Sequence, residues 1–209
     1  MKVSILFSGG KDSCLATVML SNFFEVELIT YSFGLLSNWK KAEEAAKKLS
    51  FSFDELRTSS FKVLKLDEKI LEEAVKQTIQ DGFPANGIKY IHQKALETLA
   101  GQTELIADGV RRDDRVPVLS LSEIRHLEDK FNVHYIQPLA GYSRKTMDIL
   151  VNRFFEIKEY KSFDSIGAEY EFELREYIKR KYGVEKVKEI FPQDHTQSIV
   201  VEIKKDFDN

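Results

Sequence analysis

The residues best suited to chemistry in this chain stand together near its start, in the run Ser8-Gly9-Gly10-Lys11-Asp12-Ser13. They follow an apolar segment, residues 3–7, and precede a helical pattern. Two glycines permit a tight turn that leaves backbone N–H groups accessible, and the positive end of the following helix attracts anions. The serine hydroxyls and the Lys11 ammonium add donors suited to phosphate. The run therefore predicts a phosphate-binding loop, and the Asp12 carboxylate predicts that a divalent cation accompanies the phosphate.

The spacing of this loop matches neither the longer glycine loop that ends in Gly-Lys-Ser/Thr nor the Gly-x-Gly-x-x-Gly turn. Its plainer interpretation is a glycine turn capped by serine. The motif resembles the PP-loop of the ATP pyrophosphatases, a family that includes the N-type synthetases, the tRNA thiolation and lysidine enzymes, and the diphthamide-type ligases. The resemblance implies that ATP and Mg²⁺ bind here, that Lys11 and Asp12 are catalytic, and that the whole run from Ser8 to Ser13 contacts the nucleotide.

A second charged cluster, residues 108–115, follows the apolar strand expected over Glu104–Ala107. The carboxyl ends of parallel strands meet at one edge of a sheet, so we expect this cluster beside the phosphate loop. Most charge runs are solvated loops, but a neighbouring phosphate site favours a functional interpretation. Carboxylates could hold magnesium and guanidinium groups could bind phosphates; the candidates are Asp108, Asp113 and Asp114 for the metal, and Arg111, Arg112 and Arg115 for the phosphates.

The resemblance extends to this turn, because PP-loop enzymes commonly carry a strand-end motif that ends in Asp-Asp. It implies Asp12, Asp113 and Asp114 as metal ligands, and we expect Arg112 to be catalytic. The other expected nucleotide contacts are Tyr31, Ser32, Asp108, Gly109, Arg111 and Arg115. The histidine that several tRNA-modifying members carry here is missing. The stretch 107–117 is most similar to a small archaeal-type group of PP-loop proteins described as predicted ATPases or as tRNA-thiolation-related subunits.

Strand-like apolar runs alternate with helix-period segments along the chain. We expect strands at Lys2–Phe7, Val26–Phe33, Ser52–Leu56, Glu104–Ala107 and Val133–Ile136, and helices at Lys11–Asn22, Asn38–Leu49, Leu64–Ile79, Gly87–Leu99, Ser122–Lys130 and Arg144–Glu156. This alternation predicts an α/β fold with a doubly wound parallel sheet. The resemblance implies the Rossmann-like, adenine nucleotide alpha hydrolase-like form of that fold. We assign residues 1–161 to the ATP-binding domain and 162–209 to a small appendage packed on the same core, with a helix at Ala168–Tyr182 and a β-type run after His195.

The composition is that of a soluble globular protein. The 209 residues are 43% hydrophobic and 31% charged, and the net charge of −3 argues against indiscriminate binding of nucleic acid. No apolar run approaches the roughly 20 residues of a membrane helix, and no targeting pattern opens the chain. We expect a cytoplasmic protein, with a homodimer as the default assembly.

Two weaker signals lie outside these clusters. Lys89 and His92 share one helix face that could receive substrate, although a satisfied surface histidine is the commoner situation. The segment Gly141–Lys145 opens a helix and could bind a second anion, although a plain Ser143 cap explains it equally well.

These residues allow a substrate oxygen to attack the α-phosphorus of ATP and release pyrophosphate, after which a second nucleophile displaces AMP. Cys14 is the only cysteine, so the chain lacks the cysteine pair or cluster of a self-sufficient thiolation enzyme. Either ammonia is the second nucleophile or a partner protein supplies the sulfur. The acceptor, tRNA or a small metabolite, stays open. The alternative function is a non-catalytic ATP-binding subunit or nucleotide sensor.

Overall fold

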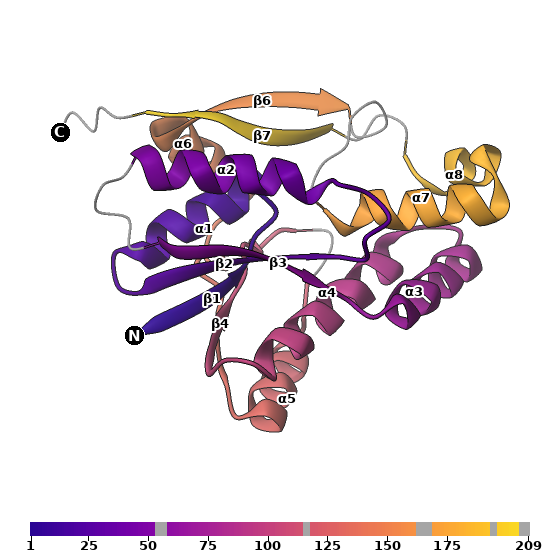
Figure 1. Cartoon of the computed structure of the whole chain (residues 1–209), viewed down its shortest axis with the longest axis horizontal. Coiled ribbons are helices and arrows are strands. Elements are labelled where there is room, and N and C mark those ends of the chain that lie inside the picture. Colours follow the sequence, from indigo (N-terminus) through magenta and orange to yellow (C-terminus); the bar gives the residue numbers. More distant parts are fainter. Residues whose placement is uncertain (53–57, 115–117, 162–168, 193–195, 205–209) are drawn as a thin grey trace.

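The computed structural model describes residues 1–52, 58–114, 118–161, 169–192 and 196–204. Its centre is a five-stranded sheet of order β3-β2-β1-β4-β5 in which every neighbouring pair is parallel (Figure 1). The strands are β1 (Lys2–Leu6), β2 (Glu25–Ser32), β3 (Thr58–Lys65), β4 (Leu105–Ala107) and β5 (His134–Ile136). This order confirms the expected doubly wound α/β fold, with the switch in strand order between β1 and β4.

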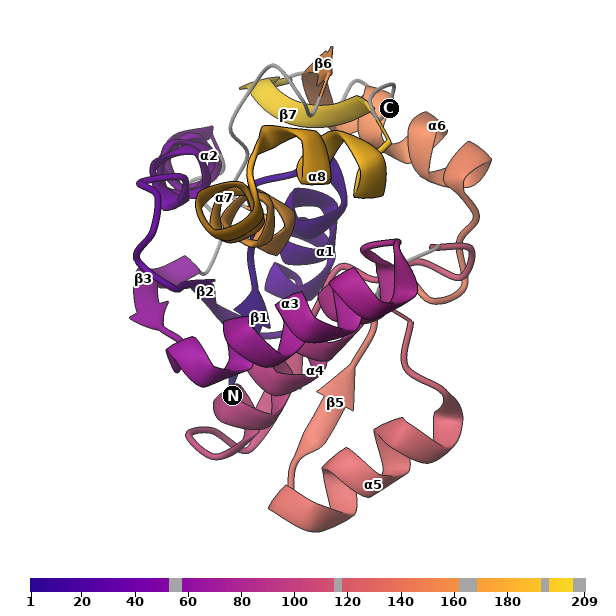
Figure 2. The same cartoon turned by 90° about the vertical axis from the view of Figure 1, so that its right-hand side faces the viewer.

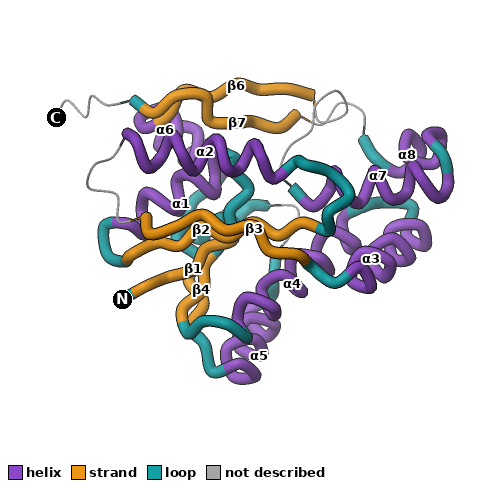
Figure 3. The backbone as a smooth tube through the Cα atoms, in the orientation of Figure 1, coloured by secondary structure: helices purple, strands orange, loops and turns teal. Residues whose placement is uncertain are grey.

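Helices cover both faces of the sheet (Figures 1 and 2). One face carries α1 (Lys11–Ser21), α2 (Trp39–Ser52) and α6 (Arg144–Phe154). The other carries α3 (Glu68–Asp81), α4 (Ala85–Ala100) and α5 (Leu121–Phe131), and α7 (Tyr170–Tyr182) packs on α3 and α4 with α8 (Val184–Ile190) beside it. A small antiparallel pair, β6 (Phe155–Lys161) and β7 (Thr196–Ile203), lies beyond the α1–α2 layer, as the tube view in Figure 3 also shows. None of the described helices is both long and apolar enough to span a bilayer.

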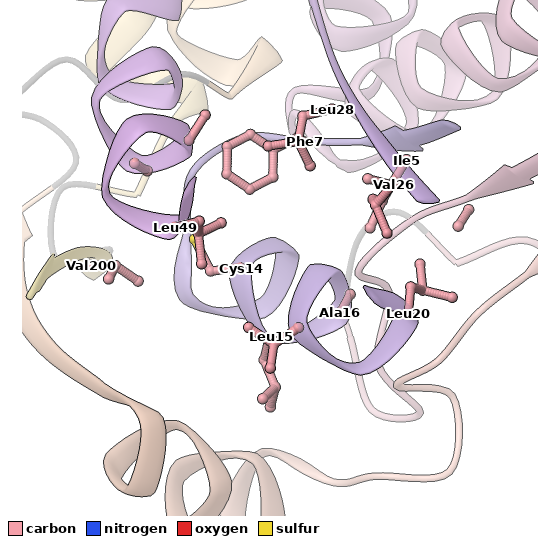
Figure 4. Packing of buried hydrophobic residues seen from close by; sticks show 14 of the residues in the cluster. Ile5, Phe7, Cys14, Leu15, Ala16, Leu20, Val26, Leu28, Leu49 and Val200 are labelled. Atoms are coloured by element: carbon pink, nitrogen blue, oxygen red, sulfur yellow. The ribbon is translucent and has the colours of Figure 1, made fainter. Parts of the chain in front are cut away.

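The core under α1 shows why the chain begins as it does (Figure 4). Ile5 of β1 and Leu28 of β2 are almost fully buried, as expected of central parallel strands covered on both faces. Cys14 and Leu15 pack α1 against this layer, and Val200 of β7 belongs to the same cluster. The first strand, the first helix and the C-terminal strand therefore share one core.

The third strand lies later in the sequence than expected. The strand expected at Ser52–Leu56 falls mostly on residues 53–57, which lie outside the described ranges; Ser52 itself belongs to α2, and β3 begins at Thr58. The helix expected from Leu64 begins at Glu68 instead. Asp67 caps it by accepting a hydrogen bond from the Lys69 N–H at 2.9 Å, and Gly82 ends it at φ 66°.

The strand β6 was not expected from the sequence. The helix expected over Arg144–Glu156 ends at Phe154, and the next seven residues form a strand that pairs with β7. An isolated bridge joins Ile199 of β7 to Gly10 of the phosphate-binding loop. The division at residues 161 and 162 stays a prediction, but the described residues on either side of it contribute to the same cavity.

Candidate functional site

The loop between β1 and α1 is held in shape by a glycine that no other residue could replace without movement. Gly9 adopts a φ of 72°, and a Cβ placed on it would lie 2.9 Å from Ala42 Cα. The backbone of α2 therefore packs directly on the loop, and the left-handed conformation that turns the chain favours glycine on its own account. Gly9 shapes the loop from behind and is not among the residues that line the cavity described below.

Both serines of the loop form hydrogen bonds within it. The Gly10 N–H donates to Ser8 Oγ at 3.3 Å, and Ser13 Oγ donates to the Gly10 carbonyl oxygen at 3.0 Å. Gly10 precedes α1 without a side-chain cap. The first turn of α1 thus begins at the sheet edge with its dipole and N–H groups available to an anion.

A cavity of about 770 Å³ opens over this helix start. The segments that line it are the β1–α1 loop, the end of β2, the first half of α4, the turn after β4, the start of α6, and parts of β6, α7 and β7. Pockets that hold small molecules usually measure about 300–1,000 Å³. The cavity lies where the strand order reverses, which is where ligands bind in folds of this type.

Lys11 faces a carboxylate that the sequence analysis did not identify. Its Nζ lies 2.7 Å from Asp148 Oδ1 of α6, and only 12% of the Lys11 side chain is exposed. The Asp148 side chain is 44% exposed. A phosphate that approached the loop could therefore replace Asp148 as the partner of the Lys11 ammonium, because Asp148 would remain solvated.

The three aspartates expected to bind a metal surround a guanidinium. Arg111 Nε lies 3.3 Å from Asp12 Oδ2, and Arg111 Nη1 lies 3.8 Å from Asp113 Oδ1. Asp114 forms the tightest contacts with Arg111: it accepts from its backbone N–H and its Nε, both at 2.8 Å, and from Nη2. Within the described ranges, no group of three or more His, Cys, Asp or Glu side chains is arranged to hold a metal ion. Arg111 neutralises the charge that a cation would otherwise balance.

Asp12 is nevertheless left incompletely satisfied. Its Oδ1 is buried and has no hydrogen-bond partner. Burial raises the pKa of Asp12 to about 6, although the nearby Arg111 opposes this shift. A carboxylate oxygen that is buried, lacks a hydrogen-bond partner and lies beside a phosphate-type loop is suited to a hard cation, so magnesium fits at Asp12.

Asp113 has a structural partner that the sequence did not reveal. Both of its oxygens accept from the Arg144 N–H at the start of α6, at 3.0 and 3.1 Å, and this interaction lowers the pKa of Asp113. Ser143 provides no side-chain cap. Of the two alternatives for residues 141–145, the Ser143 cap is not formed, and a carboxylate of the protein itself occupies the position that a second anion could take.

The two neighbouring arginines occupy different positions. Arg111 lines the cavity, whereas Arg112 is exposed, is not one of the lining residues, and uses its backbone N–H to bond the Tyr142 carbonyl oxygen at 3.2 Å. The side chain placed to reach a ligand is Arg111 rather than Arg112, the residue expected to be catalytic. Arg115 lies outside the described residues.

Asp108 ends β4 in a buried hydrogen-bond network. Its Oδ2 lies 2.8 Å from His92 Nε2 of α4 and accepts from the Tyr135 hydroxyl, while its Oδ1 accepts from the Val110 N–H at 3.0 Å. Asp108 is 1% exposed, so these donors fully partner it.

Gly109 follows Asp108, and a Cβ there would lie 2.9 Å from the Ser13 backbone nitrogen. The turn after β4 thus packs on the start of α1, and His92 is largely buried rather than a surface histidine.

The end of β2 is fixed by a residue that no local sequence signal identified. Glu173 of α7 is fully buried and accepts from Ser32 Oγ at 3.0 Å and from the N–H groups of Phe33 and Leu35 at 2.9 and 3.0 Å. Ser32, expected to contact the nucleotide, is engaged with α7 and does not line the cavity. Tyr31 does line it.

Cys14 is fully buried in the core. Burial raises the pKa of its thiol far above the ordinary value, which opposes any role as a thiolate.

Known proteins resemble this chain over nearly its whole length. The profile of a family described as "Family of unknown function (DUF7411)" matches residues 1–202. An uncharacterized protein of Methanocaldococcus jannaschii is 42% identical over 207 residues, which are 99% of this chain and 98% of that protein. A crystal structure from Methanocaldococcus jannaschii DSM, of a "predicted subunit of tRNA methyltransferase", is 42% identical and matches with a TM-score of 0.88 over 98% of each chain.

Proposed function

This chain belongs to the DUF7411 family of unknown function, and we propose that it binds ATP with Mg²⁺ in the cavity and adenylates a substrate oxygen, with release of pyrophosphate. The observation that carries the proposal is the cavity of about 770 Å³ built over an α1 start that has no side-chain cap. The Ser8–Ser13 run that forms this start resembles the PP-loop of the ATP pyrophosphatases. An ATP pyrophosphatase-type ligase or transferase uses such a loop to hold the phosphates that leave.

In this proposal each charged group at the helix start has a separate task. The first turn of α1 and the Ser8 and Ser13 hydroxyls bind the β- and γ-phosphates. Lys11 leaves Asp148 and stabilises the negative charge that develops on pyrophosphate. Arg111, which lines the cavity, binds a phosphate with two parallel N–H donors.

Magnesium would be held by Asp12, whose buried Oδ1 lacks a partner, and by Asp114 of the turn after β4, whose charge acts on Asp12. When bound, the ion would neutralise phosphate charge. Asp114 becomes available only if Arg111 turns toward a phosphate and releases it. Because Arg111 balances the carboxylates in the meantime, it keeps the two aspartates close together without a cation.

Exposed cations near the cavity support tRNA as the acceptor. Arg112 lies in the turn after β4, and Arg144 and Lys145 lie in the first turn of α6, which hydrogen bonds join to that turn. Arg144 lines the cavity, and no ion pair ties any of these three side chains to another described residue. Such cations are suited to a phosphate backbone. The structural neighbour described as a predicted subunit of tRNA methyltransferase supports the same acceptor, and the word subunit supports a partner protein that could supply sulfur or ammonia. A small metabolite is the alternative acceptor.

A second candidate function is a nucleotide-binding subunit or sensor without turnover. The observation that favours it is the internal pairing of the charged groups, since Lys11 is bound to Asp148 and Arg111 to Asp114. A subunit that only binds ATP needs no free charge at the leaving group.

Product identification separates the two functions. The protein is incubated with Mg·ATP, alone and with bulk tRNA or a panel of carboxylic acids and amides, and nucleotides are resolved by ion-exchange chromatography. AMP and pyrophosphate are expected if the chain adenylates its acceptor. Tight binding of ATP without AMP in any mixture supports the sensor, and ADP with inorganic phosphate contradicts the proposed reaction.

A further inference from the structure

The part of the cavity formed by α4 and β4 contains an oriented histidine that phosphate binding does not use. His92 lines the same cavity as Ser8, Lys11 and Ser13. Its Nε2 lies 2.8 Å from Asp108 Oδ2, and Tyr170 of α7 packs against the ring with a centroid separation of 6.3 Å and an interplanar angle of 61°. Contacts from two elements therefore fix both the position and the tilt of the imidazole.

The surroundings of Asp108 determine which nitrogen of His92 carries the proton. The Tyr135 hydroxyl donates to the carboxylate and keeps its own proton, because burial and the adjacent negative charge raise the pKa of Tyr135. The Val110 N–H donates to the other oxygen. A carboxylate that already receives these donors acts as an acceptor toward His92 as well, so neutral His92 carries its proton on Nε2 and has a lone pair on Nδ1.

The imidazole that carries Nδ1 lines the cavity. No described residue forms a hydrogen bond with it, and it is not among the buried side-chain atoms that lack a partner. One nitrogen is held by a carboxylate, the other has no partner among the described residues, and the ring lines the cavity, which is compatible with a general base oriented by an acid.

We propose that His92 is a general base that accepts the proton of a hydroxyl or amine nucleophile in this cavity, with Asp108 as its positioning residue. The inference rests on the proposed ATP-dependent reaction and narrows its acceptor. A carboxylate, a thiolate or a persulfide anion attacks without losing a proton and needs no base. A base in the cavity, together with a single cysteine that is fully buried, therefore indicates that the acceptor atom is a protonated oxygen or nitrogen rather than sulfur.

Water is the smallest nucleophile that can test this base. In that reaction an O–H bond of water breaks, an O–P bond forms at the α-phosphorus, the bond to pyrophosphate breaks, and the proton moves to Nδ1 of His92. A general base contributes about 10²- to 10⁴-fold to such a step.

The experiment measures slow formation of AMP from Mg·ATP by the whole protein and by two variants. His92→Gln keeps a polar side chain without a basic nitrogen, and His126→Gln changes an exposed histidine of α5 as a matched control. We expect His92→Gln to form AMP at least a hundredfold more slowly with an unchanged affinity for Mg·ATP, and added imidazole to restore part of the rate. His126→Gln retains the wild-type rate. A purely structural role for His92 would not produce rescue by imidazole.

The outcomes distinguish this inference from the function on which it rests. If wild type forms no AMP from ATP under any condition, the proposed function fails and the base falls with it. If wild type forms AMP and His92→Gln forms it equally fast, the base alone is wrong. A second measurement needs no turnover: ¹⁵N-detected NMR of the imidazole is expected to show neutral His92 protonated on Nε2, and protonation on Nδ1 would overturn the proposal.

Discussion

Two carboxylates at the same edge of the sheet differ in how well the fold satisfies them. Asp108, after β4, is buried and receives donors from Tyr135 and Val110 besides its contact with His92. Asp12, at the start of α1, has one buried oxygen without a partner, and burial raises its pKa to about 6. The β4 side of the site is therefore already organised, whereas the α1 side is arranged for a ligand that brings its own positive charge.

The largest effect is expected on the β4 side of the site, where the hydrogen bonds of Asp108 are complete. Asp108→Ala leaves the His92 ring, the Tyr135 hydroxyl and the Val110 N–H without their acceptor. We expect a loss of about 3 kcal/mol in the free energy of unfolding, since each buried unpaired donor costs about 1–3 kcal/mol. Urea denaturation followed by circular dichroism measures it. A loss below about 1 kcal/mol would show that this network is not the organised half of the site.

Lys11→Ala changes the α1 side of the site and is expected to leave the free energy of unfolding nearly unchanged. The ammonium is replaced where a phosphate is expected, and only a partly exposed ion pair with Asp148 is lost. We expect affinity for Mg·ATP to fall by about 30-fold, equivalent to about 2 kcal/mol, with an unfolding free energy within about 1 kcal/mol of wild type. Fluorescence titration with a labelled ATP analogue reports the affinity. Lys76→Ala, on the surface of α3, is the control, and an equal loss in both variants would remove Lys11 from the binding site.

We expect Asp12→Asn to change stability and Mg·ATP binding in opposite directions, and the change in stability depends on pH. The folded state holds the Asp12 proton up to about pH 6, whereas the unfolded chain releases it near the ordinary value of 3.8. The folded state therefore binds more protons between these values, and stability falls as pH rises through this window. At pH 8 the buried Asp12 charge, with one oxygen that lacks a hydrogen-bond partner, is present in wild type and absent in the variant.

We expect Asp12→Asn to be about 1 kcal/mol more stable than wild type at pH 8, with the difference vanishing near pH 4. The same variant should bind Mg·ATP more weakly, and Mg²⁺-dependent binding by wild type should strengthen from pH 5 to pH 7 as Asp12 ionises. Thermal melts at the two pH values test stability. A variant less stable than wild type at pH 8 would show that Asp12 is already satisfied by Arg111.

The smallest effect is expected at Cys14, which follows Asp12 closely on α1 but faces the core (Figure 4). Because its thiol is buried and its pKa is raised, Cys14→Ala should keep ATP binding and AMP formation unchanged. A packing loss of roughly 1 kcal/mol at most is expected. Loss of product formation in a folded variant that still binds ATP would restore direct sulfur transfer.

Sequence patterns predicted the parallel sheet because its central strands and amphipathic helices have strong local signals. They failed where distant partners decide the structure. The alternation in Phe155–Lys161 is typical of a strand, but it follows a helix without a break and becomes a strand by pairing with residues some 40 positions later. At β3 the polar residues 58–60 hid a strand that the neighbouring β2 stabilises.

At the site, the sequence indicated which segments would meet but not which side chain would face the cavity. Arg111 and Arg112 are adjacent and chemically identical, and only the turn after β4 decides that Arg111 points inward. Glu173 lies in a helix rich in charged residues, where nothing local distinguishes a buried carboxylate from solvated ones. Asp148 is equally unmarked, because its role exists only through the distant Lys11.

Isothermal titration calorimetry measures whether the helix start beside Asp12 is a magnesium-dependent ATP site. The titrant is α,β-methylene-ATP, which cannot lose pyrophosphate, with and without Mg²⁺, against wild type and Asp12→Asn. We predict saturable binding by wild type that strengthens at least tenfold with Mg²⁺, and loss of this Mg²⁺ dependence in the variant. No binding by wild type, or the same Mg²⁺ dependence in both proteins, would contradict the account.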